Sequence, residues 1–124
     1  GKSTFTYRPF TLEGNFAFAA AVQEMLLQSH TGTVIIFPAI PDTWKDVSFE
    51  HLRAMGGFLI SAKLSNGKIQ EAEIKAEQSG VCKIMLTDKW EWHKMKVKGS
   101  SKTIECKDNV ITVSLEKGEV IKID

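Results

Sequence analysis

The stretch Asn15–Ser29, NFAFAAAVQEMLLQS, decides how this chain is interpreted. Ten of its fifteen residues are apolar, which predicts a helix, and at about 100° per residue the bulky ones do not share one side. Phe16 and Leu27 fall on one side of the predicted helix, whereas Phe18 and Val22 fall nearly opposite. A helix that is apolar on two sides is typical of the interior of a larger protein.

The rest of the chain has the pattern of β-strands separated by turns. Asn66-Gly67 is the strongest hairpin signal, because both residues tolerate the positive φ of a type I′ turn. Gly32 is expected to end the helix as a left-handed cap. The expected strands are short and regularly spaced: Thr33–Phe37, Phe49–Ala54, Phe58–Ser65, Lys68–Ala76, Val81–Leu86, Trp92–Val97, Lys102–Cys106, Val110–Leu115 and Val120–Ile123. The sequence therefore predicts a mainly β protein, an antiparallel two-layer β-sandwich preceded by one N-terminal α-helix.

The change of pattern near residue 32 divides the chain into residues 1–31, with the helix, and residues 32–124, with the sandwich. No second helix follows against which the first could pack. We therefore expect the chain to be a piece of a larger protein in which the helix has other neighbours.

Composition excludes several classes of function. The net charge of +1 provides no basic face for nucleic acid. No apolar run approaches the roughly 18 residues of a membrane span. The histidines are isolated and the two cysteines are 24 residues apart, so we expect neither a metal site nor a cofactor. For Cys82 and Cys106 the sequence favours two buried free thiols over a disulfide.

Two sets of residues are candidates for a functional site. Glu13 precedes the N-terminus of the predicted helix, where the helix dipole favours a carboxylate, and Asn15 is a good N-cap. Plain helix capping explains both residues as well. Trp90 and Trp92 would share one face of a strand and could stack on a sugar, or they could fill the sandwich core, which large aromatic residues usually do.

Four separate strings are more specific than single residues. They are E-G-N-F, E-M-L-L-Q-S-H-T-G, F-P-A-I-P-D-x-W and L-R-A-M-G-G-F, in this order within residues 11–58. Together they resemble the C-terminal region of glycoside hydrolase family 95, the α-L-fucosidase family, whose members look like Q-I-D-G-N-F-G, A-E-M-L-L-Q-S-H, L-L-P-A-L-P-x-x-W and G-L-R-A-R-G-G-F. Beyond residue 58 the resemblance is not specific.

The resemblance implies an (α/α)₆ catalytic barrel whose last helix lies in residues 1–31, followed by a C-terminal β-sandwich in residues 32–124. It also implies an inverting mechanism, in which a glutamic acid upstream protonates the leaving oxygen and an aspartate with asparagine partners activates water. Glu13 aligns with that aspartate and is one methylene longer, and Asn15 aligns with a supporting asparagine. The parent enzyme would act on an oligosaccharide and, like other glycan-degrading enzymes, would be secreted or periplasmic.

Three interpretations follow for the chain itself. As a piece of a hydrolase with one of two carboxyl groups, it is not expected to be active alone. Its sandwich would then support the barrel through Trp44, Phe49 and the segment Pro38–Pro41. The exposed helix, residues 15–29, would either fold onto its own sheet or self-associate with the helix of another copy. The alternative function is a non-catalytic carbohydrate-binding module that uses its tryptophans.

Overall fold

The computed structural model describes residues 4–7, 16–99 and 104–124, with side chains from residue 21 onward. One α-helix, one 3₁₀ helix and short strands alternate along these residues. In chain order they are β1 (Thr4–Tyr7), α1 (Phe16–Leu26), β2 (Leu27–Gln28), β3 (Ile35–Ile36), β4 (Val47–Ala54), β5 (Phe58–Ser65), β6 (Lys68–Ala76), β7 (Gly80–Met85), η1 (Trp92–Lys94), β8 (Val97–Lys98), β9 (Ile104–Lys107), β10 (Val110–Leu115) and β11 (Val120–Ile123).

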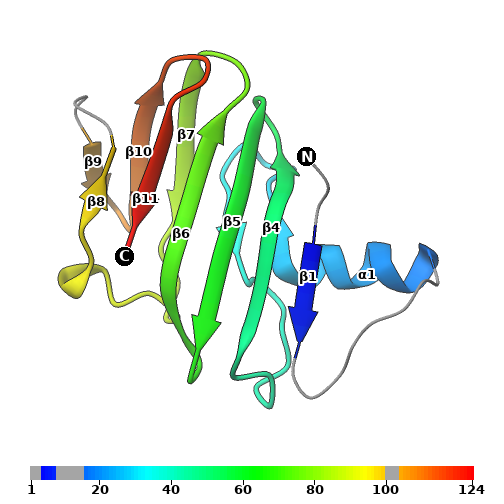
Figure 1. Ribbon diagram of the computed structural model, residues 1–124. Helices are drawn as coiled ribbons and strands as arrows, with labels where there is room; N and C mark the ends of the chain where they lie inside the picture. The colour runs from blue at the N-terminus through cyan, green and yellow to red at the C-terminus, as the bar shows by residue number, and fades with distance from the viewer. Residues whose placement is uncertain (1–3, 8–15, 100–103) are drawn as a thin grey trace.

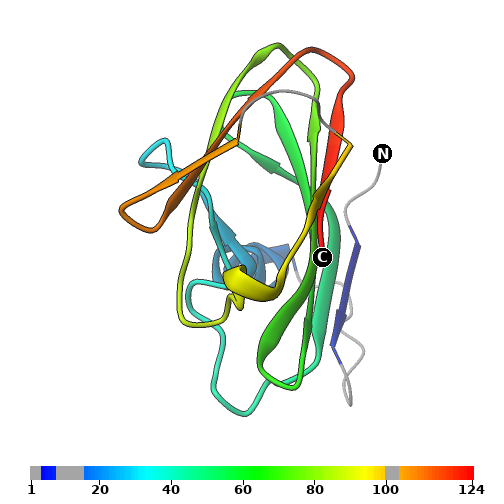
Figure 2. The ribbon, with the colours of Figure 1, turned by 90° about the vertical axis from the view of Figure 1, so that its left-hand side faces the viewer.

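The strands form two layers, which Figure 2 shows edge-on. The front layer is a six-stranded sheet in the order β1-β4-β5-β6-β11-β8 (Figure 1), and the back layer is a three-stranded sheet in the order β7-β10-β9. The short hairpin β2–β3 extends the back layer, because Val34 forms a parallel bridge with Ile84 of β7. All strand pairs within the three sheets are antiparallel, so the predicted antiparallel sandwich is confirmed.

Local sequence signals specify the central hairpins. Asn66 and Gly67 adopt φ values of 51° and 78°, as a type I′ turn requires, and β5 and β6 pair on either side of them. On β5 the alternating residues Phe58, Ile60, Ala62 and Leu64 are buried. The bounds of β5, β6, β10 and β11 match the predicted strands residue for residue.

The segment that follows the helix differs from its prediction. The helix ends at Leu26 instead of Ser29, and the strand expected over Thr33–Phe37 is reduced to β3. Gly32 has a φ of 87°, but it lies in the β2–β3 turn, where its N–H donates to the Ser29 carbonyl over 2.9 Å. The carbonyls of Met25 and Leu26, at the end of the helix, accept hydrogen bonds from the chain beyond β3.

The strand predicted over Trp92–Val97 is also wrong. Local backbone bonds from Lys94 N–H to Glu91 O and from Met95 N–H to Trp92 O close the 3₁₀ turn η1, and β8 begins only at Val97. Two nearby lysines form ion pairs, with Lys94 Nζ 3.3 Å from Glu91 Oε2 and Lys98 Nζ 3.4 Å from Asp124 Oδ1. Strand β1, in contrast, has no counterpart among the predicted strands.

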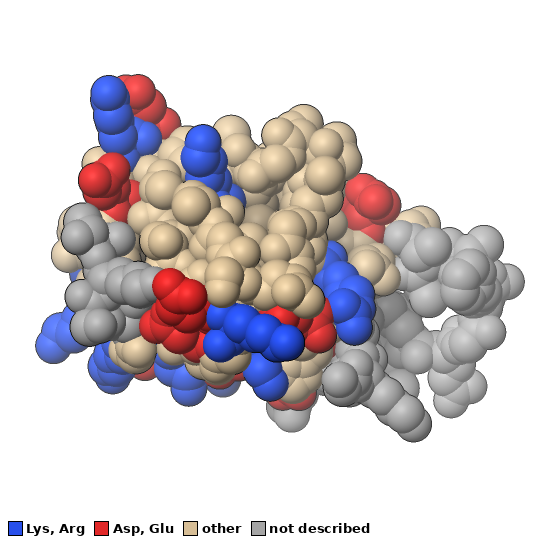
Figure 3. Space-filling view, turned by 90° about the horizontal axis from the view of Figure 1, so that it is seen from above, with Lys and Arg blue, Asp and Glu red and all other residues tan. Residues whose placement is uncertain are grey.

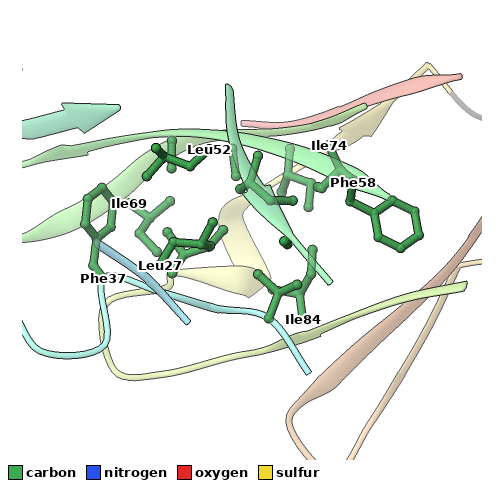
Figure 4. Packing of buried hydrophobic residues seen from close by; sticks show 14 of the residues in the cluster. Leu27, Phe37, Leu52, Phe58, Ile69, Ile74 and Ile84 are labelled. Carbon is green, nitrogen blue, oxygen red and sulfur yellow. The ribbon is translucent and has the colours of Figure 1, made fainter. Parts of the chain in front are cut away.

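The core lies between the two layers (Figure 4) and includes Val22 and Leu26 of helix α1. In the part of α1 with described side chains, Val22 and Leu26 are buried in this core, whereas Gln23 and Glu24 are exposed. Leu27, which the sequence pattern assigns to the second apolar side of the helix, belongs to β2 and is buried. The predicted second side therefore depends on Phe16, whose side chain lies outside the described residues.

Candidate functional site

The end of helix α1 is fixed directly to the sandwich. No linker separates α1 from β2, since Leu26 is the last helical residue and Leu27 is the first of the strand. Beyond β3 the chain returns to the helix, where Phe37 N–H donates to the Leu26 carbonyl over 2.7 Å and Ala39 N–H donates to the Met25 carbonyl over 3.4 Å. These bonds satisfy two carbonyls that a helix C-terminus otherwise leaves unpaired. The helix and the sandwich are thus connected by the covalent chain and by hydrogen bonds.

Phe37 is the centre of this junction. Its side chain has no exposed surface, and its ring meets the ring of Phe49 on β4 edge to face, with 5.4 Å between centroids and 69° between planes. Its φ is 56°, in the left-handed region that bulky residues avoid. Pro38 follows, and a residue before proline is disfavoured in the helical region, so Phe37 cannot continue a helix.

The two residues predicted for the base machinery lie outside this description. Helix α1 begins at Phe16, and both Glu13 and Asn15 precede it, outside the described residues. Their roles stay predictions. Self-association through residues 15–29 also stays a prediction; the exposed side of the described half of α1 carries Ala21, Gln23 and Glu24.

The two tryptophans proposed for sugar stacking do not share a strand face. Trp90 is only 7% exposed, and its indole N–H has no hydrogen-bond partner among the described residues. Trp92 is half-buried in η1 and packs against the core. The packing favours their role in the core over sugar stacking, because a stacking platform needs an open ring face.

The segment proposed to contact the barrel has two kinds of residue. Phe49 is 1% exposed and lies in the core of the sandwich, so its assignment to a domain contact is wrong. Ile40 is also buried, whereas Ala39 and Pro41 are exposed, and Trp44 is half-buried against the core. The residues of this segment that remain available for contact with the barrel are therefore the exposed ones, Ala39 and Pro41.

A groove of about 580 Å³ lies on the outer face of β4, β5 and β6. Strand β4 changes register between Phe49 and Leu52, where His51 has a φ of 57° and its N–H donates to Ser61 Oγ over 3.0 Å. The polar lining consists of serine hydroxyls and charged side chains: Asp46, Ser48, Glu50, Ser61, Lys63, Ser65 and Glu71. Glu71 also pairs with Lys122 at 3.4 Å. Among the residues with described side chains, the groove offers no open aromatic ring, because Phe49 is buried.

Two of the quoted strings meet at the end of the sandwich that holds the β4–β5 turn. The hydroxyl oxygen of Ser29, in Q-S-H-T-G, accepts a 2.9 Å hydrogen bond from the N–H of Met55, in R-A-M-G-G-F. Met55 is 58% exposed. Figure 3, which views the molecule from this end, shows a surface whose middle is formed mainly by residues other than Lys, Arg, Asp and Glu, with charged residues around its edges.

The cysteines are both free, but only one is buried. Burial raises the pKa of Cys82 to about 12, which keeps the thiol protonated at neutral pH. Cys106 lies on the edge strand β9 and is exposed, so its predicted burial is wrong. Among the residues that the structure describes, no three His, Cys, Asp or Glu side chains are grouped as metal ligands, and no helix is long and apolar enough to cross a membrane.

Sequence reasoning missed the role of Phe37, which it places inside a regular strand. The Phe37-Pro38 dipeptide is a usable signal, since proline restricts the residue before it and cannot donate to a strand ladder. The positive φ itself has no sequence signal, because left-handed residues other than glycine are usually Asn or Asp.

Two comparisons with known proteins bear on this arrangement. The sequence profile of the C-terminal domain of glycoside hydrolase family 95 matches residues 28–123. The protein named Alpha-L-fucosidase 2 from Arabidopsis thaliana is 44% identical over 71 residues, which cover 56% of this chain and 8% of the relative. The match thus covers less than a tenth of the length of that relative.

Proposed function

This chain belongs to glycoside hydrolase family 95 as its C-terminal domain, and from that premise we propose that its sandwich supports the catalytic barrel of an α-L-fucosidase-like enzyme. In this proposal residues 1–31 contribute the last barrel helix and residues 32–124 form the supporting domain. The partner of the sandwich is then the rest of the same enzyme, and the substrate of that enzyme is an oligosaccharide.

The observation that carries the proposal is the direct, hydrogen-bonded junction between α1 and the sandwich. The helix is held by its direct continuation into β2, by the bond from Phe37 N–H to Leu26 O, and by the burial of Val22 and Leu26. A domain with this connection holds the helix in one direction relative to the sheets. Support of the barrel is therefore a mechanical role that the fold can perform without binding sugar itself.

The proposed chemistry is inverting hydrolysis. Glu13 would accept a proton from a water molecule while the oxygen of that water attacks the anomeric carbon. The glycosidic bond then breaks, and a glutamic acid elsewhere in the enzyme gives its proton to the leaving oxygen. The two carboxyl groups must lie about 6.5–9.5 Å apart to admit the water. Asn15 would support the base, and the residues of this chain alone would not hydrolyse a glycoside.

The direct test is substitution of Glu13 in the full-length enzyme with an aryl α-L-fucoside as substrate. Glu13→Gln removes the base, and we expect kcat to fall by about 10²- to 10⁴-fold, the usual contribution of a general base. Gln70→Glu, an exchange of the same two side-chain types at an exposed position of β6 in the sandwich, is the matched control and is expected to retain activity. An unchanged kcat in Glu13→Gln would contradict the assignment of the base.

A further inference from the structure

The junction between α1 and the sandwich contains an unusual backbone conformation. Non-glycine residues with positive φ in the described part of the chain are Phe37, His51, Asn66, Asp108 and Asn109. Asn, Asp and His are the residue types most often found in this region, whereas a bulky aromatic residue there is an outlier. Such a conformation persists only where the surrounding structure imposes it, and it is common at functionally constrained positions.

Three contacts impose it on Phe37. The N–H donates to the Leu26 carbonyl at the end of α1, the side chain is fully buried, and the ring edge contacts Phe49 on β4. Phe37 therefore touches the last turn of the helix through its backbone and the front sheet through its ring. No other described residue is shown to link these two elements in this way.

We propose that Phe37 is a positioning residue that sets the direction in which α1 leaves the sandwich, and thereby the position of the helix N-terminus about 16 Å away. The inference rests on the proposed function, in which that N-terminus follows the base carboxylate. The length follows from the eleven residues of α1 at about 1.5 Å each.

A small rotation of the helix at its C-terminal end produces a larger displacement of its N-terminal end. A tilt of about 4° at Leu26 displaces the far end of a helix of this length by about 1 Å. A displacement of this size can lower a catalytic rate by about 10²-fold, even when it originates far from the reacting atoms. A small change in the packing of the Phe37 ring is thus expected to tilt α1 and to alter kcat. Contacts between the substrate and other parts of the enzyme would persist.

A second buried phenylalanine provides a matched control. Phe58 is 2% exposed and belongs to the same core cluster, but it begins β5 beside Gly56 and Gly80. Figure 4 shows Phe37 and Phe58 at opposite ends of the displayed cluster. Replacement of either residue removes similar apolar contacts, whereas only Phe37 bonds to the end of α1.

The experiment compares Phe37→Leu with Phe58→Leu in the full-length enzyme, with kcat and KM measured on an aryl α-L-fucoside and thermal unfolding measured in parallel. We expect Phe37→Leu to lower kcat at least 10-fold with KM within about twofold, and Phe58→Leu to keep kcat within about threefold. If Phe37→Leu does not fold, Phe37→Met, whose unbranched side chain adapts more easily to the space of the ring, and its control Phe58→Met replace the pair.

Two results would overturn the inference. Equal losses of kcat in both variants would show only a general effect of weakened packing, and an unchanged kcat in Phe37→Leu would show that the helix direction does not depend on this ring. The Glu13→Gln variant separates this inference from the proposed function. Full activity of Glu13→Gln contradicts the base assignment. A large loss of kcat in Glu13→Gln together with an unchanged kcat in Phe37→Leu contradicts the positioning role alone.

Discussion

The β5–β6 hairpin and the helix junction show two ways in which this sequence specifies structure. In the hairpin, alternating apolar residues and the Asn66-Gly67 turn determine strands of eight and nine residues from local signals. In the junction, β2 and β3 have two residues each, and their position depends on contacts with α1, β4 and β7. The hairpin is thus defined locally, whereas the junction is defined by tertiary packing.

The largest expected effect concerns the junction. Phe49→Ala removes a ring that is 1% exposed and contacts Phe37, and we expect the free energy of unfolding to fall by about 3–5 kcal/mol. Urea denaturation followed by circular dichroism would measure it. Val120→Ala, at a side chain that is 37% exposed, is the control and should cost far less. A loss below about 1 kcal/mol at Phe49 would mean that the junction is not tightly packed.

Glycine substitutions compare the turns of the two regions. Gly67 in the hairpin and Gly32 in the β2–β3 turn have φ values of 78° and 87°, and a Cβ added at either position would meet no atom closer than 3.5 Å. Alanine at each should therefore lower the stability by about 1–2 kcal/mol through backbone strain alone. If Gly32→Ala were neutral while Gly67→Ala was not, the β2–β3 turn would be free to relax.

The back layer can be probed through the pH dependence of its buried thiol. Cys82 has a pKa of about 12 in the folded chain, against an ordinary value of 9.0. The unfolded chain therefore loses this proton at a lower pH than the folded chain. The contribution of the thiol to the free energy of unfolding is fully present below about pH 9. It falls by about 1.4 kcal/mol per pH unit as the pH rises toward 12. Cys82→Ala should remove this part of the slope in denaturation curves between about pH 9 and 11. An identical slope in both proteins would contradict burial of the thiol.

The smallest effect is expected at the surface beside the β4–β5 turn. Arg53 Nη1 lies 2.6 Å from Glu77 Oε1, but the two side chains are 72% and 32% exposed. Water and salt screen such a pair, so Arg53→Ala should change the free energy of unfolding by less than about 1 kcal/mol. A thermal unfolding series with Glu77→Ala and the double variant would isolate the pair. A coupling above about 2 kcal/mol would give this surface a larger part in stability than its exposure suggests.

The same contrast explains what the sequence could predict. Strands β5, β6, β10 and β11 are predicted to the residue, because their alternation and turns are local signals. The early end of α1 at Leu26 and the left-handed conformation of Phe37 are linked to the hydrogen bond from the Phe37 N–H to the Leu26 carbonyl. No pattern of neighbouring residues predicts this hydrogen bond. The alternation around Trp90 and Trp92 favours a strand, but local 3₁₀ bonds and burial of Trp90 prevail.

For the site, the sequence indicates the family through four spaced strings, and the profile match over residues 28–123 agrees with that resemblance. Glu13 and Asn15 could be proposed only by their resemblance to the family pattern, since a lone carboxylate before a helix is a weak signal by itself. The groove on β4, β5 and β6 has no sequence signal, because its residues come from strands that are brought together by pairing and by the change of register at His51.

The central claim is that the sandwich holds helix α1 as part of one cooperative unit. Hydrogen exchange on the 124-residue chain measures this most directly, because amides that open together exchange with the same free energy. We predict that the hydrogen-bonded amides of α1 exchange as slowly as those of β5. Exchange of the α1 amides at the rate of an unprotected chain, with β5 still protected, would contradict the account.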